Sequence, residues 1–383
     1  MCWNKLYEPA ALARDAAVAA ALDRADVSVE QCNSSLLFEP GAILNQQQLP
    51  YRVFTPFWRT LEKQLDTLPP PRPAPRKLPA VTRTVRGLDL DQLQLLPKIA
   101  WDEGLAAQWT PGEQGAQLQL KDFVKQVAAY PSGRDRPDHA QTSRLSPHLH
   151  HGEIGPRQII AALSHRRAEA ASDHGSATYL RQLGWREFAH QLLFHFPATT
   201  DQPLDARFAA QRWSGAKAHL RAWQRGSTGL PIVDAGMREL WRTGWMHNRV
   251  RMIVASLLTK NLQINWLTGA RWFWDTLVDA NLANNTLGWQ WVAGCGADAA
   301  PYYRIFNPVL QAKRFDPQRR YIRQWVPEIA ALPDRWIHQP WAAPEHILHE
   351  SGVQLGVNYP KPVVDLGESR QRALTAYAQL PRL

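Results

Sequence analysis

Residues 245–262 read WMHNRVRMIVASLLTKNL, and the spacing of their apolar residues decides the fold class. Six apolar residues recur at intervals of three and four: Met246, Val250, Ile253, Val254, Leu257 and Leu258. That interval places them on one side of an α-helix. The other sides carry Asn248, Arg249, Arg251 and Met252. The stretch therefore predicts a helix with a buried stripe and a polar face.

The same periodicity recurs through most of the chain after about residue 95. It is present in DFVKQVAAY (122–130), in YLRQLGWREFAHQLLFHF (179–196) and, after a loop, in STGLPIVDAGMREL (227–240). The end of the chain, 359–380, finishes in a further expected surface helix. Little strand pattern interrupts these segments, so residues 96–383 are predicted to form one mainly helical domain.

The first 55 residues have a different pattern. AALARDAAVAAALDRA (10–25) has helical spacing, and DVSVEQCNSSLLFEP (26–40) holds a short strand-like stretch and a second apolar stretch at Leu36–Phe38. One helix and about two strands cannot close a sheet, so residues 1–55 predict an incomplete α/β domain. LPPPRPAPRKLP (68–79) then predicts an extended connector, because proline fixes φ and lacks a backbone donor. We place the connector at residues 56–95.

The composition bounds the class of protein. Of the 383 residues, 45% are apolar, which suffices for a sizeable core. No run of 18 apolar residues and no signal pattern is present, so neither a membrane span nor secretion is expected. The three cysteines form no CxxC pair and the histidines at 148, 150 and 151 have no acidic or Cys partner at ligand spacing. We therefore expect no metal site and a reducing, cytoplasmic location.

Two compositional features leave alternatives open. The net charge is +10, from 44 Lys and Arg against 34 Asp and Glu, which suits a polyanionic partner or ordinary solubility. The 17 tryptophans can serve as core residues or as stacking platforms for flat ligands. Trp213, Trp266 and Trp289 lie in three different segments, and spacing alone does not show whether they meet.

Two polar clusters are candidate ligand sites. The first holds hydroxyls and a guanidinium just before a helical stretch, at Thr142, Ser143, Arg144 and Ser146. Such groups suit a phosphate, although an ordinary capped helix start has the same pattern.

The second cluster combines Asn248, Arg251 and Met252, at i, i+3 and i+4, with the run DANLANN (279–285). A buried Arg251 would need an acidic partner, and Asp279 is the candidate. The amides of this run both donate and accept hydrogen bonds, so the cluster can hold a flat heterocycle or form a polar clamp between helices.

Five motifs, in this order, resemble those of the photolyase/cryptochrome family. They are TSRLSPHL (142–149), LGWREF (183–188), TGLPIVDAGMREL (228–240), TGWMHNRVRM (243–252) and GWQWVAGCGADAAPYYRIFNP (288–308). The resemblance extends back through PYRVFTPFWR (50–59) and covers essentially the whole chain. It implies a mainly helical, FAD-binding domain preceded by part of a Rossmann-like α/β domain.

The resemblance also implies a cofactor site for FAD in its reduced form. The positions that match FAD contacts are Tyr130, Thr142, Ser143, Arg144, Leu145, Ser146, Asn248, Arg251, Asp279, Ala280, Asn281 and Asn285. The first six match phosphate and sugar positions, and the others match positions beside the isoalloxazine. Trp289, Trp266 and Trp213 match a chain of electron carriers that leads from the flavin to the surface.

The activity that the resemblance implies is light-driven repair of cyclobutane pyrimidine dimers flipped out of damaged DNA, double- or single-stranded, by a monomer. The substrate positions that match are Arg134, Gln182, Trp185, Arg186, Asn248, Arg249, Met252, Trp291 and Gln311. A blue-light receptor of cryptochrome type, or an inactive chain, are the alternatives. Retention of Trp185 and Met252 favours repair over signalling.

The chain departs from the family pattern at three places. Gln182 stands where dimer-specific members carry Glu, so we expect slower repair or a shifted preference. Asn281 stands where some members have Asp, and His247 followed by Asn248 favours the dimer-repair branch over the (6-4) branch. The first residues match the middle of the family's α/β domain, which predicts a truncated domain and makes an antenna chromophore doubtful.

Overall fold

The computed structural model describes the chain except for residues 78–86, 170–173, 300–301 and 382–383, and describes only the backbone of 165–169. Two strands are present in the described part, β1 (Cys2–Asn4) and β2 (Glu30–Cys32). The helices before the site region are α1 (Pro9–Arg24), α2 (Phe54–Glu62), α3 (Glu103–Gln108), α4 (Glu113–Gln126), α5 (Tyr130–Gly133), α6 (Ser146–His150), α7 (Pro156–Glu169) and α8 (His174–His195).

The regular structure of the second half is almost entirely helical in its described residues. Its helices are α9 (Lys217–Gln224), α10 (Pro231–Thr243), α11 (Asn248–Ser256), α12 (Trp266–Thr276), α13 (Leu282–Ala293), α14 (Pro308–Phe315), α15 (Arg320–Trp325), α16 (Glu345–Glu350) and α17 (Leu366–Ala378). Short 3-10 turns connect several of them, and α11 continues into one π-helical turn, Leu257–Asn261. The mainly helical fold class is thereby confirmed.

The N-terminal unit consists of β1, α1 and β2, with the two strands paired in parallel. The structure corrects the strands that the sequence suggested for this unit. Leu36–Phe38 is not a strand, because the amides of Leu37 and Phe38 donate to the Glu187 carboxylate of α8 instead of to a neighbouring strand. The strand that pairs with β2 is β1 (Cys2–Asn4), which was not predicted.

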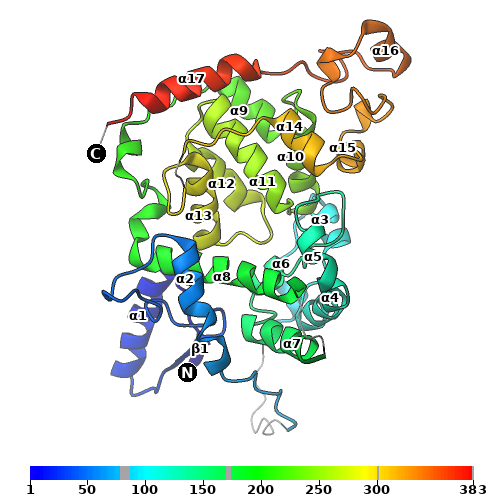
Figure 1. The fold of residues 1–383 in the computed structure, drawn as a ribbon. Helices are drawn as coiled ribbons and strands as arrows, with labels where there is room; N and C mark the ends of the chain where they lie inside the picture. Colours follow the sequence, from blue (N-terminus) through cyan, green and yellow to red (C-terminus); the bar gives the residue numbers. More distant parts are fainter. Residues whose placement is uncertain (78–86, 170–173, 300–301, 382–383) are drawn as a thin grey trace.

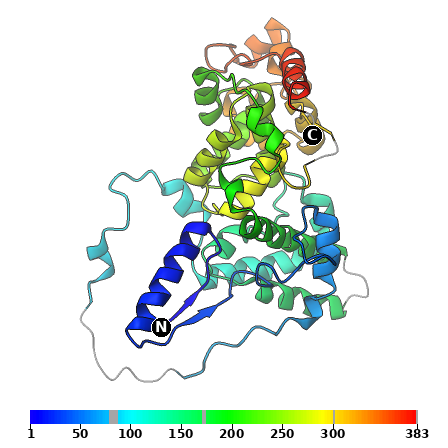
Figure 2. The same ribbon diagram turned by 90° about the vertical axis from the view of Figure 1, so that its left-hand side faces the viewer.

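Helix α2 lies inside the stretch predicted as connector and packs on the helical domain. Its Phe57 and Leu61 are fully buried and share a core cluster with Leu183 and Phe188 of α8. The described stretches that follow α2 in the predicted connector, 63–77 and 87–95, run around the outside of the N-terminal unit (Figure 2). The domain boundaries themselves stay a prediction.

Two hydrophobic cores organise the helical part. One gathers side chains from α2 and α4 to α8, and the other gathers side chains from α9 to α15. Helices α8 and α13 pack together where the two cores meet, and α13 passes through the middle of the molecule (Figure 1). Residues at the rims of both cores, such as Trp185, Met252 and Trp291, are only partly buried. This junction holds the candidate site.

Candidate cofactor and DNA site

Helix α13 presents an open polar face, on which Asn284 and Gly288 are exposed. Asn281 caps the helix by accepting from the backbone amide of Asn284, and its Oδ1 also accepts from the Asn284 side chain. Asn285 and Gly288 follow on the same side, and a Cβ added to Gly288 would meet no atom within 4 Å. Because the opposite side of α13 is packed, the row from Asn281 to Gly288 borders space that a flat ligand can fill.

Helix α11 contributes the matching face. Asn248 is exposed, while Arg251 and Met252 are half-buried beside buried Val250. The stripe predicted from residues 245–262 is buried as expected, and the polar residues between its members face the junction with α13. Amides, a guanidinium and a thioether on one surface suit a heterocycle with polar edges.

The buried ion pair expected between α11 and the start of α13 is confirmed. Nη2 of Arg251 donates to both carboxylate oxygens of Asp279, at 3.1 and 2.9 Å, and Nε donates to the Met246 carbonyl at 2.7 Å. The Asp279 side chain is only 4% exposed. Burial of both charges is tolerable because each is paired and hydrogen-bonded.

A hydrogen-bonded chain orients the Asn281 amide. Nδ1 of His190 lies 2.9 Å from the Arg186 carbonyl, and its Nε2 lies 3.4 Å from Nδ2 of Asn281. A carbonyl can only accept, so Nδ1 carries the proton and Nε2 accepts from the amide. Burial lowers the pKa of His190 to about 3, so this chain is neutral.

The Tyr130–Ser146 segment lies on the other side of the junction. Tyr179 of α8 donates from its hydroxyl to Oγ of Ser143 at 2.8 Å, and Tyr130 packs edge-on against the Tyr179 ring. Arg144 has a left-handed φ of 49°, and its guanidinium lies over the Trp245 ring, 4.6 Å from the centroid. The side chain of Arg144 thus anchors the segment, which leaves hydroxyls and backbone amides for an anion.

Glu239 of α10 holds the start of α11 and the Tyr321 side chain in place. It accepts a 2.6 Å hydrogen bond from the Tyr321 hydroxyl and a longer one from the backbone amide of His247, the N-cap of α11. Burial raises the pKa of Glu239 to about 7, although Tyr321 and Arg144 oppose that shift. Nε2 of His247 is buried without a hydrogen-bond partner among the described residues.

The three tryptophans lie on segments that contact one another. A Cβ on Gly269 of α12 would lie 2.1 Å from the Trp289 ring, so Trp289 lies directly against α12, one turn from Trp266. The segment after Trp213 is tied to the segment before Trp266 by the bond from Gly215 N to the Gln263 carbonyl. Trp289 and Trp266 are buried and Trp213 is partly exposed.

The substrate-matched arginines are held by other polar side chains. Arg134 donates to Oε1 of Gln182 at 3.0 Å, and Arg249 of α11 donates to Asp135 at 2.9 Å. Nη1 of Arg249 also lies 3.8 Å from the sulfur of Met252. These contacts bring α5, α8 and α11 together at one edge of the site.

The aromatic side chains expected to line the substrate cavity are each backed by a second group. Trp185 stacks on Phe54 of α2, with ring centroids 3.7 Å apart and planes 9° apart. Trp291 donates from Nε1 to the Asp298 carbonyl, and the Arg304 guanidinium lies over its ring. Phe54, Asp298 and Arg304 were not predicted. Phe54 contacts a partner far away in sequence, whereas Asp298 and Arg304 contact Trp291 through loop geometry that no helical spacing reveals.

The remaining predicted residues differ in exposure. Arg186 donates to the Ser35 carbonyl and its side chain is 12% exposed. Ser146 is exposed, Leu145 is buried, and Thr142, Ala280 and Gln311 are partly buried. Trp223, a further residue not predicted, lies with its ring 6.2 Å from that of Trp289.

Two searches of the described residues add context. None of their helices is both long enough and apolar enough to cross a membrane. Among the described residues, no group of three or more His, Cys, Asp or Glu side chains lies close enough together to bind a metal ion.

Comparison with known proteins gives two family matches, one in each part of the chain. Residues 179–379 match the family described as the FAD binding domain of DNA photolyase, and residues 1–76 match the family described as DNA photolyase. A deoxyribodipyrimidine photo-lyase of Agrobacterium fabrum is 45% identical over 99% of this chain and 79% of its own length. Cryptochrome-2 of Arabidopsis thaliana is 38% identical over 96% of this chain, which spans 62% of that protein.

A solved structure agrees with the fold over nearly the whole chain. The crystal structure of a bacterial class III photolyase from Agrobacterium tumefaciens superimposes with a TM-score of 0.94 at 44% identity. The match covers 98% of this chain and 78% of that one.

Proposed function

Because the chain belongs to the photolyase/cryptochrome family, we propose that it repairs cyclobutane pyrimidine dimers in DNA by light-driven electron transfer from FAD. The observation that carries the proposal is the open polar face of α11 and α13, with its buried Arg251–Asp279 pair, beside an edge built from Trp185 and Trp291. A polar flat-ligand site next to an aromatic one suits a flavin next to a pyrimidine dimer.

The side chains present fit FAD. Gly288 leaves room against α13, Asn281 and Asn285 offer amides, and the Arg251–Asp279 pair supplies a charged edge. Nδ2 of Asn285 donates to the Ala270 carbonyl at 2.9 Å, so its Oδ1 remains to accept from the ligand. Reduced FAD, when bound, supplies the light-excited electron that opens the cyclobutane ring and receives it back.

The phosphates and sugars of FAD fall, in this proposal, to the segment from Tyr130 to Ser146. Its hydroxyls at Thr142, Ser143 and Ser146 and its backbone amides can donate to phosphate oxygens. The segment is preorganised, because Tyr179 holds Ser143 and the packing of Arg144 on Trp245 fixes the left-handed turn. Leu145 and Ala280 contribute apolar contact.

The substrate is held, in this proposal, by its faces and by its phosphates. Trp185 and Trp291 contact the flat faces of the flipped dimer, Met252 contacts its edge, and Gln182 and Asn248 hydrogen-bond the pyrimidines. Arg134, Arg249 and Gln311 contact the DNA backbone. Arg186, whose side chain is largely buried, adds positive charge near the DNA without contacting it. A net charge of +10 supports binding to DNA phosphates.

The partner proposed is damaged DNA, double- or single-stranded, bound by one copy of the chain in the cytoplasm. All three cysteines are free, which suits a reducing compartment. A blue-light receptor is the second candidate, because cryptochromes are among the similar proteins and would use the same flavin face and tryptophans.

The direct test is repair by the purified chain. We expect it to copurify with FAD and, after reduction, to remove dimers from an oligonucleotide under blue light but not in the dark. Bound FAD without loss of dimers would favour the receptor. Soluble protein that binds no FAD would contradict the proposed cofactor site itself.

The three tryptophans have a separate test, Trp266→Phe. Phenylalanine stays aromatic and apolar but is much harder to oxidise. We therefore expect photoreduction of oxidised FAD to slow by about tenfold or more, which corresponds to a barrier higher by about 1.4 kcal/mol. Repair by chemically pre-reduced protein should stay unchanged. Equal photoreduction in the variant and the wild type would refute the proposed order of carriers.

A further inference from the structure

The two aromatic walls of the proposed dimer site meet at one residue that neither the family comparison nor the sequence motifs single out. The Asp298 carbonyl accepts from Nε1 of Trp291 at 3.0 Å. The Asp298 amide donates to the Arg52 carbonyl at 3.2 Å, two residues before Phe54. Phe54 in turn stacks on Trp185. The turn at Asp298 thus connects the wall on α13 to the wall on α8.

The backbone of this turn is unusual. Asp298 has φ of +56°, a left-handed conformation that Asn, Asp and Gly adopt more readily than other residues. Both main-chain contacts depend on that conformation, because it turns the carbonyl toward Trp291 and the amide toward Arg52. A residue that resists positive φ would therefore shift both contacts together.

The carboxylate adds a second link to the same elements. Burial raises the pKa of Asp298, and the backbone amide of Phe54 and the guanidinium groups of Arg181 and Arg304 oppose that shift. Arg181 lies over the Phe54 ring, and Arg304 lies over the Trp291 ring. The carboxylate thus interacts electrostatically with the two arginines that lie over Phe54 and Trp291.

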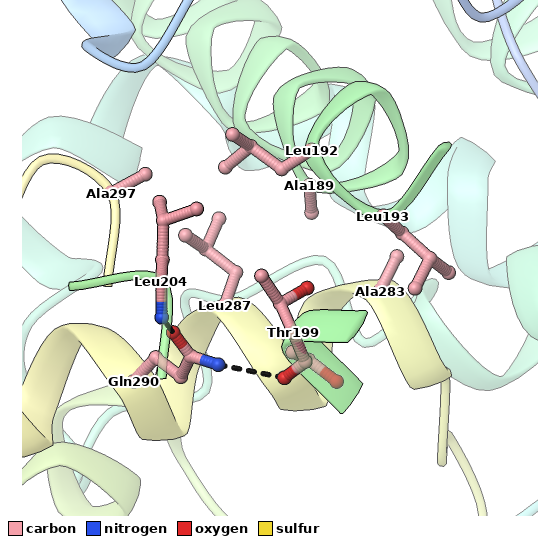
Figure 3. A pocket seen from close by; sticks show the side chains of 10 residues that line it. Ala189, Leu192, Leu193, Thr199, Leu204, Ala283, Leu287, Gln290 and Ala297 are labelled. Atoms are coloured by element: carbon pink, nitrogen blue, oxygen red, sulfur yellow. Dashed lines mark hydrogen bonds between the residues drawn. The ribbon is translucent and has the colours of Figure 1, made fainter. Parts of the chain in front are cut away.

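Helices α8 and α13 pack together, with one gap at the level of the walls. A small cavity of about 20 Å³, mostly apolar, lies between the two helices, lined by side chains that include Ala189, Leu193 and Leu287 (Figure 3). Ala297, the neighbour of Asp298, closes one side of it. Trp185 lies one helical turn before Ala189, and Trp291 one turn after Leu287. The turn at Asp298 thus lies beside the α8–α13 interface, close to the level of the two walls.

We propose that Asp298 is a positioning residue that sets the separation of Trp185 and Trp291, and thereby the discrimination between a pyrimidine dimer and undamaged DNA. This inference rests on the proposed function. The walls act only on a flipped dimer, whereas the phosphate contacts act on any DNA. Loosening the turn should therefore weaken binding of damaged DNA selectively.

The test compares Asp298→Ala with Asp298→Asn by binding of dimer-containing and undamaged duplexes. We expect alanine, which resists positive φ and lacks an acceptor, to raise the Kd for the dimer-containing duplex by about tenfold while the Kd for the undamaged duplex changes by less than about twofold. Asparagine tolerates the turn and keeps an acceptor oxygen, so it should retain discrimination. A 2-aminopurine opposite the dimer should report less flipping with alanine.

Asp201→Ala, an exposed aspartate, is the matched control and should match the wild type. Unchanged discrimination in Asp298→Ala, or a parallel loss of both affinities, FAD content and melting temperature, would overturn the inference. Equal impairment by asparagine would overturn it too, because charge and not geometry would then decide. A wild-type protein that does not discriminate would instead contradict the proposed function.

Discussion

The two sides of the candidate site are built differently. On the cofactor side, each polar side chain is bonded to a buried partner: Arg251 to Asp279, Asn281 to His190, and Glu239 to Tyr321. On the substrate side, Arg134, Gln182, Trp185, Met252 and Trp291 are partly exposed.

The difference reflects what each side binds. A resident cofactor is bound once and tightly, so a rigid, desolvated set of partners is favourable. A flipped base must enter and leave with every turnover, so its contacts remain near solvent and each contributes little. Single substitutions should accordingly have large effects on the cofactor side and small effects on the substrate side.

Asp279→Ala gives the strongest test of this comparison. It leaves the half-buried Arg251 without its counter-charge, a change that costs up to about 3–5 kcal/mol when both partners are buried. We expect FAD affinity, measured by equilibrium release of the fluorescent cofactor, to fall by about a hundredfold or more.

The matched control for that substitution is Asp275→Ala, four residues earlier and exposed. It should retain wild-type FAD affinity. If Asp279→Ala binds FAD as tightly as the control does, the cofactor side is not organised around this ion pair and the comparison fails.

Glu239 predicts a pH dependence that belongs to the cofactor side. Its pKa is raised from 4.5 to about 7 by burial, so the folded chain holds a proton that the unfolded chain releases above about pH 4.5. The stabilisation is therefore complete below pH 4.5 and is lost as the pH rises to about 7, by about 3 kcal/mol at most.

Glu239→Gln should remove this dependence, since the amide is neutral and still accepts from Tyr321. We expect the variant and the wild type to melt at similar temperatures at pH 5, and the variant to melt higher at pH 8. Glu345→Gln, on the surface of α16, should follow the wild-type profile. Parallel melting profiles for wild type and Glu239→Gln would show that the carboxyl does not stay protonated in the fold.

The sequence predicted the cofactor side better than the substrate side. Helical spacing alone placed Asn248, Arg251 and Met252 on one face, and the need of a buried guanidinium for a counter-charge pointed to Asp279. Both inferences use local spacing or a universal electrostatic requirement. The helix α11 and the ion pair were accordingly found as expected.

Other features depend on partners that no local pattern reveals. The stretch Leu36–Phe38 is apolar enough for a strand, but Glu187, about 150 residues later, binds its amides. Arg144 has the side-chain chemistry of a phosphate ligand, yet its guanidinium packs on Trp245. The turn at Asp298 is visible only once α2 and α13 are placed side by side. Roles for individual site residues stay predictions until they are tested.

Gln182→Glu should give the smallest effect and sharpens the comparison from the substrate side. Oε1 of Gln182 accepts from Arg134 at 3.0 Å, and its Nε2 donates to the Thr178 carbonyl at 3.3 Å. Glutamate would strengthen the contact with Arg134 by adding charge, and it would still accept hydrogen bonds from the pyrimidine edge. The site is partly exposed, where a charge pair typically contributes only about 0.2–1 kcal/mol.

We therefore expect Gln182→Glu to raise the repair yield per absorbed photon by about two- to threefold, with FAD affinity unchanged. Gln182→Met, which cannot hydrogen-bond, should lower the yield. An unchanged yield in Gln182→Glu would mean that glutamine at this position does not limit repair, whereas a change above about tenfold would mean that the substrate side is as preorganised as the cofactor side.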